Sequence, residues 1–190
     1  MLTIRPGVIA LAVGLMAVTA CSGGGGLQDG ESEALGDAEE GIDGVQSVRV
    51  DSTDLHTESI IDYDLRPPTG GGHNPLWWSC GFYDEPIPDE HAVHDLEHGA
   101  VWLAYSPDLP DADVELIHEL VRADPKLLAA PYPDLADGEA VVATAWARQL
   151  RLDDIGDERL VEFIEQYTDG DQAPEAGATC SGTPLGEPIT

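Results

Sequence analysis

The stretch RPPTGGGHNPLWW, residues 66–78, limits the fold more than any other part of the chain. Three prolines and three glycines stand close together in it. Proline lacks the amide hydrogen that helices and central strands require, and glycine weakens both, so neither element can run through this stretch. We therefore expect a long irregular loop, and such loops in compact domains frequently carry function.

The remaining apolar segments alternate between strand-like runs and helical spacing. The predicted elements are, in order, strands at 46–50 and 100–105, a helix at 111–124, strands at 126–130 and 139–150, and a helix at 157–167. This order predicts an α+β fold: a small, mainly antiparallel sheet with two amphipathic helices on one side and a long Pro/Gly-rich loop.

The start of the chain predicts export. Arg5 precedes an apolar run from Val8 to Ala20 that is too short and too early for an ordinary membrane-spanning helix, so residues 1–20 are typical of a signal peptide. A small residue directly before Cys21 is typical of a bacterial lipoprotein signal. We expect a lipid on Cys21 to anchor the protein to the cell membrane, on its extracytoplasmic face. The alternative is a plain signal peptide followed by a chance cysteine.

Composition divides the rest of the chain into a linker and one domain. Residues 21–44 are rich in glycine and then in acidic residues, with almost no large apolar side chain, so we expect a disordered tether. Residues 45–190 form a single globular domain, long enough to bury a core. The formal net charge of −29 excludes nucleic acid as a partner bound through charge, and the sequence identifies no protein partner.

Two cysteines remain once Cys21 is assigned to the lipid. Cys80 and Cys180 form an even pair in an exported domain, where a disulfide is stable. Closing a loop of about 100 residues is worth up to roughly 4 to 5 kcal/mol in the chain-entropy treatment. The alternative is that both thiolates bind a metal ion, although the two cysteines do not form a CxxC arrangement.

The segment HAVHDLEH, residues 91–98, is the strongest candidate for chemistry. His94 and His98 are four residues apart, so a helical turn places both rings on one face, close enough to share a metal ion. Glu97 falls beside them. In zinc proteases the glutamate directly follows the first histidine, whereas Asp95 holds that place here, so we exclude a zinc-protease motif.

Five segments of the chain together resemble the domain-of-unknown-function 3105 family, whose members are exported or membrane-anchored proteins, mainly of bacteria. In order, they are HTESIIDY, RPPTGGGHNPLWWSCGFYDEPIP, VHDLEHGAVWLAY, TAWARQL and QAPEAGATC. The family pattern is matched at His56, His73, Cys80, His94, Glu97, His98 and Cys180. It is not matched at His91 or His118, which we expect on the surface, and Gly71-Gly72 departs from the usual turn. The resemblance implies no established activity.

The matched histidines come from three separate segments, and we expect at least three of their rings to surround one metal ion. The expected ligands are His56, His73, His94 and His98, and the neighbouring acceptors that orient the rings are Asp95 and Glu97. Imidazole suits copper and zinc. Both methionines lie in the signal peptide, which excludes a methionine-rich site for Cu(I) and leaves Cu(II), Zn(II) or Cu(I) held by histidine alone.

Two other hypotheses stay open. One is a metal-dependent enzyme in which Glu97 acts as general base beside an open metal position. The other is an interaction module without metal, in which the histidines only lock a loop through hydrogen bonds. No nucleophile elbow, phosphate-binding loop or dinucleotide fingerprint occurs in the sequence, so enzymatic activity is left undecided.

Overall fold

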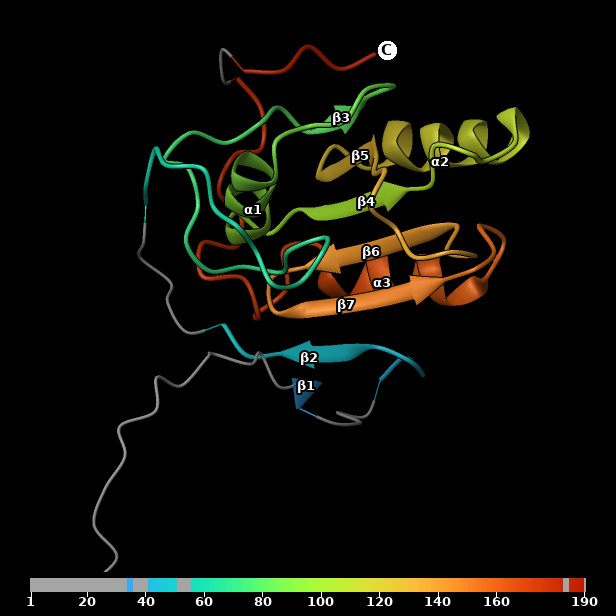
Figure 1. Ribbon diagram of the computed structural model, residues 1–190, viewed down its shortest axis with the longest axis horizontal. Coiled ribbons are helices and arrows are strands. Elements are labelled where there is room, and N and C mark those ends of the chain that lie inside the picture. Colours follow the sequence, from blue (N-terminus) through green and yellow to red (C-terminus); the bar gives the residue numbers. More distant parts are fainter. Residues whose placement is uncertain (1–33, 36–40, 51–55, 183–184, 190) are drawn as a thin grey trace, which may run out of the picture. The chain divides into compact units, whose positions relative to one another are not determined.

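The computed structural model describes residues 34–35, 41–50, 56–182 and 185–189 (Figure 1). The signal peptide, Cys21 and most of the linker lie outside these residues, so the corresponding expectations stay predictions. Within the described residues, no helix combines the length and apolar character needed to cross a membrane.

Within the described part of the chain, seven strands form one sheet in the order β1-β2-β7-β6-β4-β5-β3 (Figure 1). They are β1 (Ala34–Leu35), β2 (Gln46–Val48), β3 (Gly81–Phe82), β4 (Val101–Tyr105), β5 (Leu127–Pro131), β6 (Val141–Ala145) and β7 (Arg148–Leu152). Strand β5 runs parallel to β3 and β4, and the other four pairs are antiparallel. The prediction of a mainly antiparallel sheet in a mixed α and β fold is confirmed. Strand β1 lies within the segment assigned above to the linker.

Among the described residues, three helices pack on the sheet, one more than predicted. The two predicted helices, α2 (Asp111–Ala123) and α3 (Glu158–Tyr167), cover one face. Their side chains form a core with Val101 and Leu103 of β4. The third helix, α1 (Asp89–Glu97), packs on the other face with Trp102 and Ala104. This separation follows from the alternation of side chains along a strand, which sends successive residues to opposite faces.

Helix α1 is absent from the predicted elements, which included only a helical turn at His94 and His98. The helix begins directly after Pro88, and an acidic first turn that includes Asp89 suits the positive end of the helix dipole. It ends before Gly99, which has a φ of +90° and takes the left-handed conformation that stops many helices. Its apolar stripe is fully buried and consists of Ala92, Val93 and Leu96. The stripe is short and interleaved with charged residues, which is why the pattern was missed.

Residues 139–150 form a hairpin and not the single long strand that we predicted. Ala145 of β6 pairs with Arg148 of β7, and only Trp146 and Ala147 lie between the strands. Ala147 has a φ of +58°, a value that tight hairpin turns require. Such turns usually contain asparagine, aspartate or glycine, so the sequence carries no turn signal here.

Candidate metal centre

Four side chains of metal-binding type converge beside α1. His56, His73, His94 and Glu97 each offer one ligand atom, and these atoms lie within 4.8 Å of one another. Oε2 of Glu97 is 3.0 Å from Nε2 of His73 and 3.7 Å from Nε2 of His56. The centroids of the three imidazole rings are 4.8 to 5.2 Å apart. Three of the four predicted histidines therefore surround one point, together with a carboxylate.

The four members of the group come from three separate segments of the chain. His94 and Glu97 lie three residues apart on α1, and helical geometry places such a pair on one face. His73 comes from the Pro/Gly-rich loop and is fully buried. It forms an isolated bridge with His56, in which the amide of Thr57 donates to the carbonyl of His73 at 2.8 Å. The side chain of His56 is 47% exposed, so the group reaches solvent on this side.

Backbone carbonyls fix the tautomer of three histidine rings. The Nδ1 atoms of His73, His94 and His98 lie 2.7 to 2.8 Å from the carbonyl oxygens of Gly71, Asn74 and Thr179, respectively. A carbonyl only accepts hydrogen bonds, so each Nδ1 must carry the proton and donate it. The Nε2 atom of a neutral ring then has a free lone pair, which is the form that binds a metal ion.

The free Nε2 atoms face other acceptors at close range. Nε2 of His94 is 3.0 Å from Nε2 of His98, and two lone pairs at that distance repel each other unless a cation lies between them. The same holds for Nε2 of His73 and Oε2 of Glu97, which are also 3.0 Å apart. Burial lowers the pKa of His94 to about 4, which opposes satisfying this ring with a proton.

His98 is next to this group but not a member of it. Its ring meets that of His94 edge-on, with centroids 4.5 Å apart, and its Nε2 atom is 3.5 Å from Oε2 of Glu175. The ring of Trp77 covers both imidazoles, with centroids 5.2 Å from His98 and 5.8 Å from His94. We did not predict Glu175, although it lies in the segment QAPEAGATC that supports the family resemblance.

Asp95 does not take the ring-orienting role that we expected. It follows His94 by one residue, which turns its side chain about 100° around the helix. Its Oδ2 atom accepts a hydrogen bond from the amide of Trp78 at 3.2 Å, and its Oδ1 atom is 3.6 Å from Sγ of Cys180. Burial raises the pKa of this carboxyl well above its usual range. Glu97, the other expected orienting residue, lies among the ligand atoms themselves.

The disulfide predicted between Cys80 and Cys180 is present, with Cα atoms 5.3 Å apart. Bonded sulfurs offer no thiolate, so the structure does not favour these cysteines as metal ligands. The bond also fixes the residue before Cys180, Thr179, whose carbonyl orients His98. Lys126 reinforces the same region, because its Nζ atom donates to the carbonyl of His98 at 2.8 Å.

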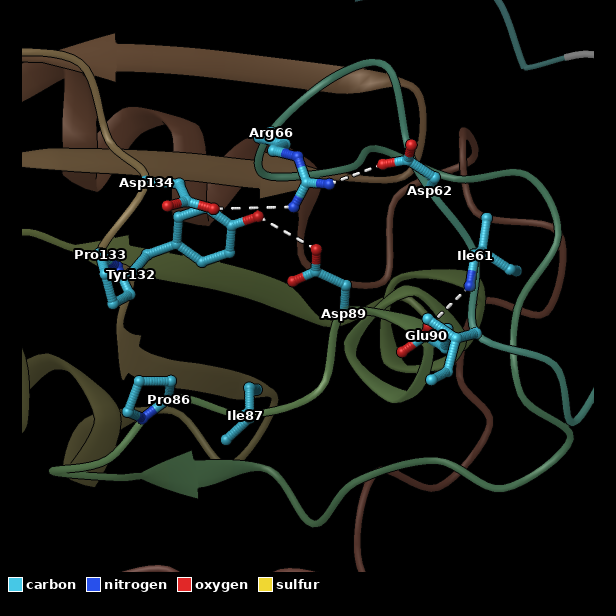
Figure 2. Close-up of a pocket in the computed structure, with 11 residues that line it drawn as sticks. Ile61, Asp62, Arg66, Pro86, Ile87, Asp89, Glu90, Tyr132, Pro133 and Asp134 are labelled. Atoms are coloured by element: carbon cyan, nitrogen blue, oxygen red, sulfur yellow. Dashed lines mark hydrogen bonds and ion pairs between the residues drawn. The ribbon is translucent and has the colours of Figure 1, made fainter.

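A pocket of about 530 Å³ lies at the amino end of α1 (Figure 2). The hydroxyl of Tyr132 donates to Asp89 there at 3.0 Å, and Arg66 pairs with Asp62 and Asp134 across 2.9 and 3.7 Å. None of the candidate metal ligands lines this pocket. The acidic side chains that line it are paired, and it is separate from the histidine group.

The sequence model of one protein family, described as "Protein of unknown function (DUF3105)", matches residues 55–182. No curated protein and no solved structure matches the chain. The matched region contains every candidate ligand, both cysteines of the disulfide and helices α1, α2 and α3. The chain therefore belongs to the DUF3105 family of proteins of unknown function.

Proposed function

We propose that this protein binds a divalent transition-metal ion, copper or zinc, outside the cytoplasm, where a lipid on Cys21 holds it to the membrane. The proposed ligands are His56, His73, His94 and Glu97. Four ligands of this kind suit Zn(II) and Cu(II), whereas Cu(I) prefers softer sulfur ligands.

The observation that carries the proposal is the orientation of the imidazole rings. Histidines that only lock a loop are free to use both ring nitrogens in hydrogen bonds. Here Nδ1 of His73 and of His94 donates to a backbone carbonyl, and each Nε2 faces another acceptor at 3.0 Å. Satisfying His94 with a proton instead would place a positive charge where burial lowers the pKa of this ring to about 4. A single divalent ion bound by His56, His73, His94 and Glu97 takes up the lone pairs of this group together, which supports metal binding over the interaction module.

The geometry favours a binding site over a hydrolytic one. Catalytic zinc sites keep one coordination position open for water, whereas sites that only bind the metal fill four positions with protein atoms. Glu97 lies 3.0 Å from His73 within the ligand group, so it is not free to act as a separate general base.

Metal content tests the proposal. We expect the untagged, purified protein to retain copper or zinc, measured by inductively coupled plasma mass spectrometry, and to bind either ion in competition titrations. His73→Asn and His94→Asn should each weaken binding at least about tenfold, since perturbing a metal site commonly costs that much or more. The matched control is His91→Asn, on the same helix but outside the group. Equal affinity in all four proteins, or none in the wild type, contradicts the proposal.

The membrane location has its own test. Cys21→Ala should release the protein into the soluble fraction, because a plain signal peptide leaves no lipid on the mature chain. A variant that still sediments with membranes after a carbonate wash contradicts the lipid anchor.

A further inference from the structure

His98 is the one predicted ligand that stays outside the inner group of His56, His73, His94 and Glu97. The ligand atoms of the inner group lie within 4.8 Å of one another, and His98 is not among the residues of that group. His98 nevertheless presents a buried ring, with Nδ1 fixed by a carbonyl and Nε2 free.

A carboxylate from near the end of the sequence, that of Glu175, faces that nitrogen. Oε2 of Glu175 is 3.5 Å from Nε2 of His98. The backbone of Glu175 is tied to α1, because its amide donates to the carbonyl of Glu97 at 2.9 Å. The side chain of Glu175 is 58% exposed, whereas that of His98 is 6% exposed. The His98 side of the pair is therefore buried at the end of α1, and the Glu175 side reaches solvent.

The segment that carries Glu175 is anchored at several points around His98. Nζ of Lys126 donates to the carbonyls of His98 and Ala178 at 2.8 and 2.6 Å, and it pairs with Asp169 at 2.8 Å. The disulfide closes the segment at Cys180. These contacts hold the carboxylate and the imidazole at a separation close to that of two ligands on one ion.

We infer that His98 and Glu175 form a second, outer site for a divalent metal ion, on the solvent side of the inner centre. This inference rests on the proposed function. Two protein ligands with water in the remaining positions bind more weakly than the inner set of four. His94 is 3.0 Å from His98, so the two sites are neighbours, and the carboxylates of Glu97 and Glu175 offset part of the repulsion between two cations.

Zinc titration by isothermal calorimetry tests the outer site on the full, metal-free protein. The wild type should show two binding steps, a tight one and a weaker one. Glu175→Gln should weaken the second step about tenfold or more and leave the first within about twofold. The matched control, Glu165→Gln, removes the same charge from an exposed position on α3 and should retain both steps. His73→Asn should remove the tight step and leave the weak one.

The outcomes separate this inference from the proposed function. A wild type with one tight step that Glu175→Gln leaves unchanged overturns the outer site and preserves the inner one. Loss of the tight step in Glu175→Gln also overturns it, since Glu175 would then belong to the inner centre. No zinc binding at all overturns the proposed function and this inference together. Should Glu175→Gln disturb folding by circular dichroism, Glu175→Asp, with a shorter reach, makes the same test.

Discussion

Helix α1 buries polar side chains on two faces, and their surroundings differ. His94 and Glu97 lie on one face and Asp95 on the other. On one face, His94 and Glu97 place lone pairs near other acceptors, an arrangement that a cation stabilises. On the other face, Asp95 lies beside the disulfide, where burial raises the pKa of its carboxyl well above the usual range and favours the protonated form. The comparison shows that the chemistry of a buried group depends on how many acceptors meet there. One helix therefore carries a group of possible metal ligands and, directly after His94, a buried carboxyl with a raised pKa.

The largest effect on stability is expected from removing the disulfide that lies beside Asp95. Replacing both Cys80 and Cys180 by alanine should lower the free energy of unfolding by roughly 4 kcal/mol, because the unfolded chain regains the freedom of a loop of about 100 residues. Urea denaturation of the metal-free protein measures this loss. Both cysteines must be changed together, since a single free thiol introduces other chemistry. An unchanged urea midpoint contradicts a stabilising role for the disulfide.

On the other face, His94 should have a smaller effect on the free energy of unfolding, and this effect should depend on pH. The pKa of His94 is about 4 in the folded protein and 6.5 in an ordinary setting, so the unfolded chain binds more protons between these values. Stability of the metal-free protein should therefore fall as the pH drops from 6.5 to 4, by at most about 3 kcal/mol from this residue. Urea unfolding at a series of pH values measures the slope. The slope should be reduced in His94→Asn, and the same slope in both proteins contradicts the assignment.

The smallest effect is expected from Asp95→Asn, and its pH dependence has the opposite sign. The raised pKa means that the folded protein binds more protons than the unfolded chain above pH 3.8, so Asp95 lowers stability as the pH rises. Asparagine removes this cost and keeps an oxygen for the amide of Trp78. The variant should unfold at higher urea than the wild type at pH 7, and the difference should vanish near pH 3.5. A variant less stable at pH 7 contradicts this account.

Local spacing was enough to predict part of the site. His94 and His98 lie four residues apart, so any helical turn brings their rings together, and the family resemblance added His56 and His73. Two other features were not visible in the sequence. The side of α1 on which Asp95 lies depends on how the helix is rotated against the sheet, and its short apolar stripe gives little indication of that rotation. Glu175 meets His98 only because tertiary packing and the disulfide return the end of the chain to α1.

The fold shows the same limit. The amphipathic patterns of α2 and α3 were sufficient to predict both helices, because each has a clear apolar face. The hairpin between β6 and β7 was missed because Trp146 and Ala147 are not usual turn residues. Its turn is supported from outside by the loop, where the amide of Ala147 donates to the carbonyl of Thr69 at 2.8 Å. Such support is a property of the packed domain and leaves no mark on the local sequence.

The most direct test of the central claim is nitrogen-15 NMR of the histidine side chains, with and without zinc. We predict that, at pH 7, His73 and His94 carry their proton on Nδ1 in the metal-free protein. On addition of zinc, the Nε2 signals of both rings should shift as the lone pairs bind the ion, while Nδ1 stays protonated. Rings that carry the proton on Nε2, or Nε2 signals that zinc leaves unchanged, would contradict a metal centre at this site.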